Sequence, residues 1–396
     1  MPGGADPRRH DAVAAVAVVA ALAVIMLVAA VATAAAAPPA GPTARAAVVG
    51  GEGAPRGAYP WIVALNVGCG GTLIAPDRVL TAGHCVEDLR VSTLRLYVGA
   101  HQRKRGGFRY DGLSVQAVDV ASHPRYRSLE NGGPTNDAAI VKLAAPVPNV
   151  PLARLATRAE APLFAGGEEA TVIGWGVTRT DLQSAPLATG LQRGRLRILD
   201  DTSCNRVYGQ DDTYRRSVML CARSRNRYRS PNTSPCVGDS GGPLVVGDTQ
   251  VGIVSFGISC GALHEPTVFS RVANLRDFID QPEPVWSPQP LGRAQVTGTL
   301  APGHIATCVA PEFRNRVDHL RYRWGINGVL VATGRRVRIT SNARGKVLQC
   351  RAVAENAGGS TPSPASPEQR VPRSGSAPAT PAPAQPLRRG AAAEPF

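Results

Sequence analysis

The sequence Gly-Asp-Ser-Gly-Gly-Pro at residues 238–243 determines how the whole chain is interpreted. Upstream, the chain carries Thr-Ala-Gly-His-Cys at residues 81–85 and Asn-Asp-Ala-Ala-Ile at residues 136–140. A serine hydroxyl is a weak nucleophile at neutral pH, so it needs an imidazole to take its proton and a carboxylate to orient that imidazole. Each motif alone is a modest signal, because Gly-Asp-Ser-Gly is also a turn sequence and a lone histidine is usually structural. Together they indicate nucleophilic catalysis by Ser240, His84 and Asp137.

In these motifs, from about residue 48 to 281, the chain resembles the chymotrypsin/trypsin family of serine endopeptidases. The resemblance implies two six-stranded antiparallel β-barrels with the catalytic residues in the cleft between them. Short apolar-alternating segments separated by turn residues independently indicate an all-β fold. They lie at residues 61–67, 94–98, 170–173, 196–198 and 251–256, and the best helical pattern is at residues 272–279.

The resemblance also implies a role for each catalytic residue. His84 is expected to act as general base toward Ser240 and then as general acid, while Asp137 orients the imidazole. The backbone N–H groups of Gly238 and Ser240 are expected to form the oxyanion hole. Ser255 matches the family serine that hydrogen-bonds the catalytic aspartate.

The specificity pocket implied by the resemblance is lined by Ser234, Pro235, Val237, Gly257 and Thr267. Trypsin itself has a carboxylate at the position of Ser234, and without it a buried basic substrate side chain would be unpaired and costly. Thr267 narrows the interior, so we expect a small or medium apolar residue before the scissile bond. The alternative is that Glu265 or Asp211 reaches the pocket and restores a basic preference.

Activation in the family requires a new N-terminus that pairs with the aspartate before the nucleophile. Val48 and Asp239 match these two positions, but Ala47 precedes Val48 where a basic residue is usual. We therefore expect cleavage after Ala47 by a protease that favours small residues, such as the enzyme itself, or by signal peptidase. A chain that is never cut would remain an inactive zymogen.

The first 37 residues have the pattern of a secretory signal peptide, with Arg8 and Arg9 before an apolar run at residues 12–37. A short propeptide is expected at residues 38–47 and a secreted product follows. The run is also long enough for an uncleaved membrane anchor, which is the alternative. Membrane association is expected only in that case.

The chain contains eight cysteines, which in an exported protein indicate disulfides. The resemblance implies the pairs Cys69–Cys85, Cys204–Cys221 and Cys236–Cys260, and it leaves Cys308 and Cys350. The cysteine and histidine spacing lacks a zinc pattern. The loop at residues 99–110 carries basic residues where some relatives have calcium ligands. No metal and no cofactor are therefore expected.

The net charge of +15 comes almost wholly from arginine. Basic runs at residues 103–105 and 223–229 can meet acidic polymers, but solvated arginine faces are the simpler interpretation. With 5% aromatic residues and no nucleic-acid-binding motif, no nucleic-acid partner is expected.

The chain beyond residue 281 changes in composition. Residues 282–290 form a Pro-rich linker, and residues 365–396 are a low-complexity segment expected to be disordered. Between them, Cys308, Trp324 and Cys350 have the order and approximate spacing of an immunoglobulin-like domain at residues 291–364. Its role is either attachment to a surface or protein, or passive stabilisation.

Two functions compete at this point. The first is a secreted serine endopeptidase with a protease domain at residues 48–281, protein or peptide substrates and an activating protease as partner. The second is a silent or zymogen-locked binding protein on a protease scaffold. Such scaffolds usually lose a catalytic residue, whereas His84, Asp137 and Ser240 are all present, so the sequence favours the enzyme.

Overall fold

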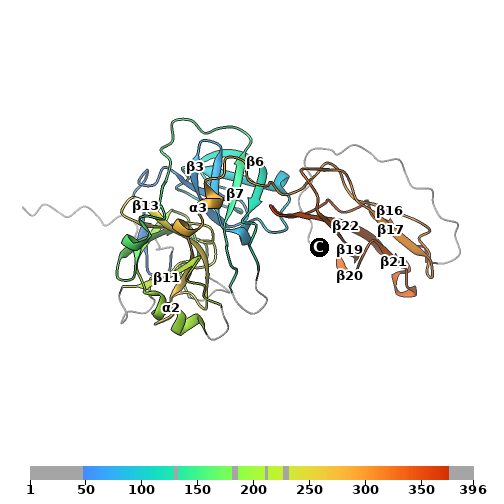
Figure 1. Ribbon diagram of the computed structural model, residues 1–396. Coiled ribbons are helices and arrows are strands. Elements are labelled where there is room, and N and C mark those ends of the chain that lie inside the picture. Colours follow the sequence, from blue (N-terminus) through green and yellow to red (C-terminus); the bar gives the residue numbers. More distant parts are fainter. Residues whose placement is uncertain (1–47, 129–132, 181–185, 210–212, 226–231, 374–396) are drawn as a thin grey trace, which may run out of the picture. The chain divides into compact units, whose positions relative to one another are not determined.

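The computed structural model describes residues 48–128, 133–180, 186–209, 213–225 and 232–373. The first of its two barrels is closed and antiparallel, in the strand order β2-β3-β4-β7-β6-β5 (Figure 1). Its strands are β2 (Ile62–Leu65), β3 (Cys69–Ala75), β4 (Arg78–Thr81), β5 (Arg95–Val98), β6 (Leu113–Ser122) and β7 (Ala139–Leu143). Leu73, Leu80 and Leu96 are fully buried inside it. Burial of these branched side chains is the main force that closes the barrel.

The second barrel closes through antiparallel pairing of β9-β10-β11-β14-β13-β12 and back to β9. Its strands are β9 (Glu169–Gly174), β10 (Gln192–Ile198), β11 (Met219–Ser224), β12 (Pro243–Val246), β13 (Thr249–Gly257) and β14 (Thr267–Arg271). Strand β10 shows the period-2 pattern clearly, since Leu196 and Ile198 are buried whereas Arg195 and Arg197 are exposed. The expectation of two six-stranded antiparallel barrels is confirmed.

Short elements complete these barrels. Strand β1 (Glu52–Gly53) pairs with β10, and β8 (Arg154–Leu155) pairs with β13 in parallel. Helix α2 (Asp201–Tyr208) begins after Asp200, whose carboxylate accepts the N–H of Ser203 and so caps the helix. The expected helix at residues 272–279 is instead two pieces, the 3-10 turn η6 (Val272–Asn274) and α3 (Arg276–Ile279). Leu275, with φ −102° and ψ 5°, lies outside helical geometry and separates them.

Four disulfides are present, and their pairs are the three that the resemblance implies plus the remaining one. They are Cys69–Cys85, Cys204–Cys221, Cys236–Cys260 and Cys308–Cys350. The first holds strand β3 to the turn that carries His84. The third joins the segment just before Ser240 to the segment after β13. Disulfides of this kind restrict the unfolded chain and fix the loops that they join.

The C-terminal part contains three separate sheets. One pairs β15 (Gln289–Pro290) with β18 (Phe313–Arg314), and another has the order β16-β17-β21, formed by β16 (Gln295–Thr297), β17 (Ile305–Val309) and β21 (Arg336–Arg338). The third contains β19 (His319–Ile326), β20 (Val329–Thr333), β22 (Val347–Asn356), β23 (Gly359–Pro362) and β24 (Gln369–Arg370). Trp324 and the Cys308–Cys350 disulfide are fully buried in one cluster. This arrangement does not by itself identify an immunoglobulin-like sandwich.

No helix in the described part of the chain has the length and apolar composition that crossing a bilayer requires.

Candidate active site

His84 and Asp137 come from segments next to two neighbouring strands of the first barrel. His84 lies in the 3-10 turn η2 (Gly83–Cys85) just after β4, and Asp137 lies just before β7. The Nδ1 of His84 donates to Asp137 Oδ2 at 2.8 Å, and the backbone N–H of His84 donates to Asp137 Oδ1 at 2.9 Å. Because a carboxylate only accepts, this contact fixes the proton on Nδ1 and leaves Nε2 with a free lone pair.

Ser255 and Ser270 complete the surroundings of Asp137. The Ser255 hydroxyl donates to Asp137 Oδ2 at 2.5 Å, while the Ser270 hydroxyl donates to the Asp137 backbone carbonyl at 2.7 Å. Asp137 is fully buried, so its charge depends on these donors and on His84. Sequence reasoning found Ser255 but missed Ser270. The sequence signal for Ser270 is a polar side chain in the segment that forms β14, at a position that the structure shows to be buried.

The pKa of His84 reflects two opposing effects. Burial of the imidazole acts to lower it, whereas the charge and hydrogen bond of Asp137 act to raise it. The two contributions from Asp137, with a smaller one from the charge of Glu87, prevail, so the pKa of His84 is raised above its ordinary value of 6.5. The side chain of His84 is 28% exposed, which leaves Nε2 able to contact a substrate.

Ser240 lies in a tight turn that requires glycine. Gly238 and Gly241 have φ values of 98° and 75°, which residues with a Cβ rarely adopt. The backbone carbonyl of Ser240 accepts the N–H of Gly70 at 2.7 Å, and this bond joins the turn to the first barrel. Within the described residues, no hydrogen bond joins the Ser240 hydroxyl to His84. No internal acceptor there takes the backbone N–H groups of Gly238 or Ser240 either.

Asp239 is buried beneath this turn. Its carboxylate accepts the backbone N–H groups of Gly176 at 2.8 Å and Cys236 at 3.0 Å. Burial raises its pKa to about 6, although the two N–H donors act to lower it. A Cβ at Gly176 would overlap the carboxylate, so this close approach requires glycine. Sequence reasoning had not connected Gly176 with Asp239.

The segment that starts at Val48 is inserted into the same region. Val48 and Val49 are fully buried, and the Val49 carbonyl accepts the N–H of Ser234 at 3.1 Å. Val48 has a φ of 59°, an unfavourable value for a β-branched residue. No cation is paired with Asp239 among the residues that the structure describes.

The residues expected to line the specificity pocket lie on the segments flanking Ser240 and on β13 and β14. Ser234 is buried, and its hydroxyl accepts the N–H of Gly261 at 2.6 Å. Thr267 is buried, and a Cβ placed on Gly257 would meet its Oγ1 at 3.6 Å. Pro235 is buried, whereas the side chain of Val237 is 60% exposed.

Glu265 and Asp211 are the two carboxylates that could restore a preference for basic residues. Glu265 is half-buried and accepts the hydroxyl of Ser259. Asp211 lies outside the described residues. The residues expected to line the pocket, Ser234, Pro235, Val237, Gly257 and Thr267, all carry neutral side chains.

One cluster in the described chain has metal-ligand chemistry, formed by Cys69, His84 and Cys85. Its two sulfur atoms form a disulfide, so neither is available as a thiolate ligand.

The family model described as Trypsin matches residues 48–279, which is more than half of the chain. The chain is 31% identical to a protein named trypsin from Saccharopolyspora erythraea, over 59% of this chain and 96% of that protein. It is 30% identical to trypsin iota from Drosophila melanogaster, over 60% of this chain and 88% of that protein. It is also 31% identical to phenoloxidase-activating factor 3 from Holotrichia diomphalia, over 59% of this chain and 72% of that protein. These matches cover the two barrels and their catalytic motifs, and the chain belongs to the trypsin family of serine endopeptidases.

Proposed function

We propose that this endopeptidase cleaves peptide bonds through an acyl-enzyme intermediate, with Ser240 as nucleophile, His84 as base and Asp137 as orienting group. The observation that carries the proposal is the set of bonds around Asp137. They hold the proton on His84 Nδ1 and leave Nε2 as the acceptor. In the first step, Ser240 Oγ bonds to the scissile carbonyl carbon and its proton moves to Nε2. That proton then goes to the leaving amine, and water repeats the sequence to release the acid.

The oxyanion is proposed to bind the backbone N–H groups of Gly238 and Ser240. Both groups lack an internal acceptor within the described chain, and the φ of Gly238 shapes the turn that presents them. An oxyanion formed there would gain two donors that need no reorganisation.

For substrate preference, we propose a small or medium apolar residue before the scissile bond. Ser234 is neutral and already engaged by Gly261, while Thr267 occupies space in the pocket. Burying a lysine or arginine side chain there would leave its charge without a partner. Pro235, Val237 and Gly257 complete the proposed pocket.

The first experiment is labelling of the mature protein by a fluorophosphonate probe. We expect labelling in the natural chain and none in Ser240→Ala, with a peptide library then giving the residue preference. Absence of labelling from a chain with a free Val48 terminus would contradict the proposal and favour a non-catalytic binding protein.

We further propose activation by cleavage after Ala47, which would free the α-amine of Val48 to pair with Asp239. The burial of Val48 supports this step, as does the buried Asp239 carboxylate, which has no cationic partner among the described residues. One relative is named as an activating factor for another protein, which is consistent with an activating protease as a partner here. N-terminal sequencing of labelled protein should read Val-Val-Gly-Gly. An active form beginning at Ala46 would contradict the assignment.

The domain organisation is proposed on the sequence pattern. It comprises a signal peptide (1–37), a propeptide (38–47), a protease domain (48–281), a linker (282–290), an immunoglobulin-like domain (291–364) and a tail (365–396). Residues 1–47 and 374–396 lie outside the described residues. Secretion is tested by fractionation: protein released with a processed terminus supports export, and full-length protein in the membrane supports an anchor. A binding role of the C-terminal region is tested by a pull-down that compares residues 282–396 with the full chain as bait.

A further inference from the structure

A hollow lined by four arginines lies in the protease region, and Ser240 is not among the residues that line it. Its volume is about 780 Å³, and its arginines are Arg125, Arg158, Arg215 and Arg271. The other lining residues are Asn136, Ala161, Pro162, Ala165, Ser217, Val218 and Asn274. No aspartate or glutamate is among the lining residues, and such a one-signed hollow concentrates counter-ions.

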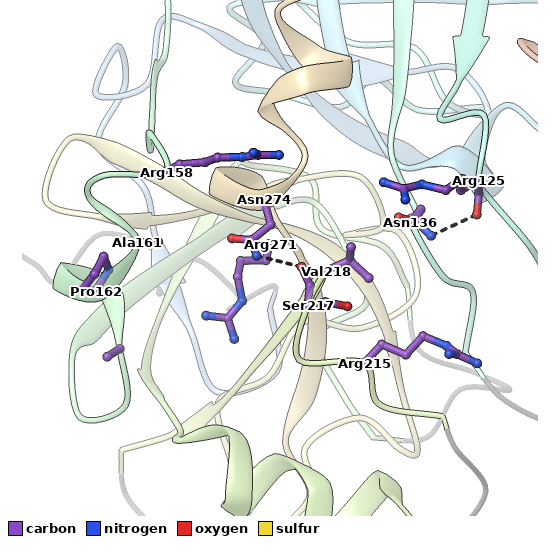
Figure 2. Close-up of a pocket in the computed structure, with 11 residues that line it drawn as sticks. Arg125, Asn136, Arg158, Ala161, Pro162, Arg215, Ser217, Val218, Arg271 and Asn274 are labelled. Carbon is purple, nitrogen blue, oxygen red and sulfur yellow. Dashed lines mark hydrogen bonds between the residues drawn. The ribbon is translucent and has the colours of Figure 1, made fainter.

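The four arginines come from segments far apart in the sequence. Arg125 lies between β6 and β7, Arg158 follows β8, Arg215 precedes β11, and Arg271 ends β14. Figure 2 shows Arg125 and Arg158 extending toward each other from opposite sides of the view, with Arg271 and Asn274 on a neighbouring strand and turn. Tertiary folding therefore assembles this charge, which no basic run in the sequence predicts.

The arginines differ in how firmly they are held. Arg271 is the fixed member, because it donates to the Met219 carbonyl at 2.8 Å and pairs with Asp201 at 2.7 Å, with only 17% of its side chain exposed. Arg158 pairs with Asp277 at 2.6 Å, but both side chains are largely exposed, so water screens this pair. Exchange of Asp277 for a stronger anion at Arg158 therefore costs little.

Arg125 is the most available positive charge. Its guanidinium makes no hydrogen bond or ion pair within the described residues, while its backbone carbonyl accepts the side-chain N–H of Asn136 at 3.0 Å. That bond fixes the backbone from which the side chain extends. The neighbouring His123 adds no charge near neutral pH, because burial, followed by the field of Arg125, lowers its pKa to about 4.

We propose that this hollow binds a compact ligand carrying two or more sulfate or phosphate groups. Guanidinium groups present paired N–H donors that match the oxygen atoms of such tetrahedral anions. The volume lies within the range of about 300–1,000 Å³ that is usual for small-ligand sites. Asn136 immediately precedes Asp137, so the site would adjoin the backbone of the aspartate proposed to orient His84.

The test is a direct binding measurement that does not depend on catalysis. Isothermal titration uses the full chain carrying Ser240→Ala, with inorganic tripolyphosphate and a trisulfated disaccharide as separate probes, at roughly 50 mM salt where screening is weak. Arg125→Gln is compared with Arg105→Gln, which removes one exposed arginine of the same region outside the hollow. Both side chains are exposed and neither makes a hydrogen bond or ion pair within the described residues, so both variants should fold.

We expect at least one probe to bind and Arg125→Gln to weaken its binding about tenfold, or about 1.4 kcal/mol. Arg105→Gln should change it less than about twofold, and Arg158→Gln should act like Arg125→Gln. If one probe binds more tightly than the other, the result supports the site and identifies phosphate or sulfate as the preferred group. The proposal is overturned if neither probe binds, or if Arg105→Gln weakens binding as much as Arg125→Gln. A short single-stranded DNA that binds more tightly than both probes and ignores Arg125→Gln also overturns it, because a diffuse basic surface would then be responsible.

Discussion

Replacement of Asp137 by asparagine gives the sharpest test of the proposed catalytic arrangement. An asparagine amide has one oxygen, whereas Asp137 uses both oxygens to accept from the His84 backbone, His84 Nδ1 and Ser255. If the amide nitrogen takes the Oδ2 position, it faces Nδ1 and drives the histidine proton to Nε2, which can then no longer accept from Ser240. If the amide nitrogen takes the Oδ1 position, its N–H faces the backbone N–H of His84, and neither donor finds an acceptor.

The expected loss of activity in Asp137→Asn follows from these two amide orientations. Loss of the correct tautomer costs about 10⁴-fold in kcat in the well-studied triad enzymes of this family. The opposed or unmet polar groups should also lower the free energy of unfolding by about 1–3 kcal/mol. Without the carboxylate, burial is opposed only by the charge of Glu87, the smallest of the contributions, so the pKa of His84 should fall from its raised value.

The assay is the second-order rate of fluorophosphonate labelling as a function of pH. Natural protein should lose reactivity as the pH falls through the raised pKa of His84, because the protonated ring cannot accept the Ser240 proton. Asp137→Asn should label far more slowly and lose its residual reactivity only at a lower pH. Ser255→Ala is the control, since it keeps the carboxylate and should lose only about tenfold. A labelling rate for Asp137→Asn within tenfold of the natural protein, with an unmoved acid limb, would refute the reasoning.

Three further predictions follow from buried contacts. The pKa of Asp239, at about 6, lies above its unfolded value near 3.8. The unfolded chain therefore loses this proton first, and uncleaved protein should lose on the order of 3 kcal/mol of unfolding free energy as the pH rises from about 4 to 7. Thermal melts should show this loss, and Asp239→Asn or a free Val48 terminus should abolish it. Thr267→Gly should widen the pocket and raise kcat/KM for a large aromatic residue relative to alanine by about tenfold, measured with matched peptides; an unchanged ratio would mean that Thr267 does not limit the pocket. Arg103 donates to the carbonyls of Leu187 and Ala188, and Leu187 packs against Gly238. Arg103→Gln should therefore lower kcat several-fold while leaving residue preference unchanged, whereas a changed preference with normal kcat would contradict this link.

The candidate catalytic motifs stand out in the sequence because each combines a reactive side chain with a local backbone requirement. Gly238 and Gly241 adopt positive φ, so the glycines around Ser240 are part of the motif. The strand segments were also predictable, because alternation such as that of Leu196 and Ile198 reports burial within one strand. The helix expected at residues 272–279 was wrong in detail, because the apolar pattern shows which side chains are buried and not whether Leu275 keeps helical dihedrals.

The sequence by itself determined which reactive groups the chain carries: a candidate serine nucleophile, a histidine and an aspartate, along with strands of period 2 and eight cysteines. Only the tertiary structure decided which groups meet across large sequence separations. It added Ser270 to the surroundings of Asp137, placed Gly176 against Asp239, and gathered Arg125 and Arg271 around one hollow. The physical reason is that motifs record local backbone and chemical needs, whereas these contacts depend on strand register and barrel closure, which many distant residues set together.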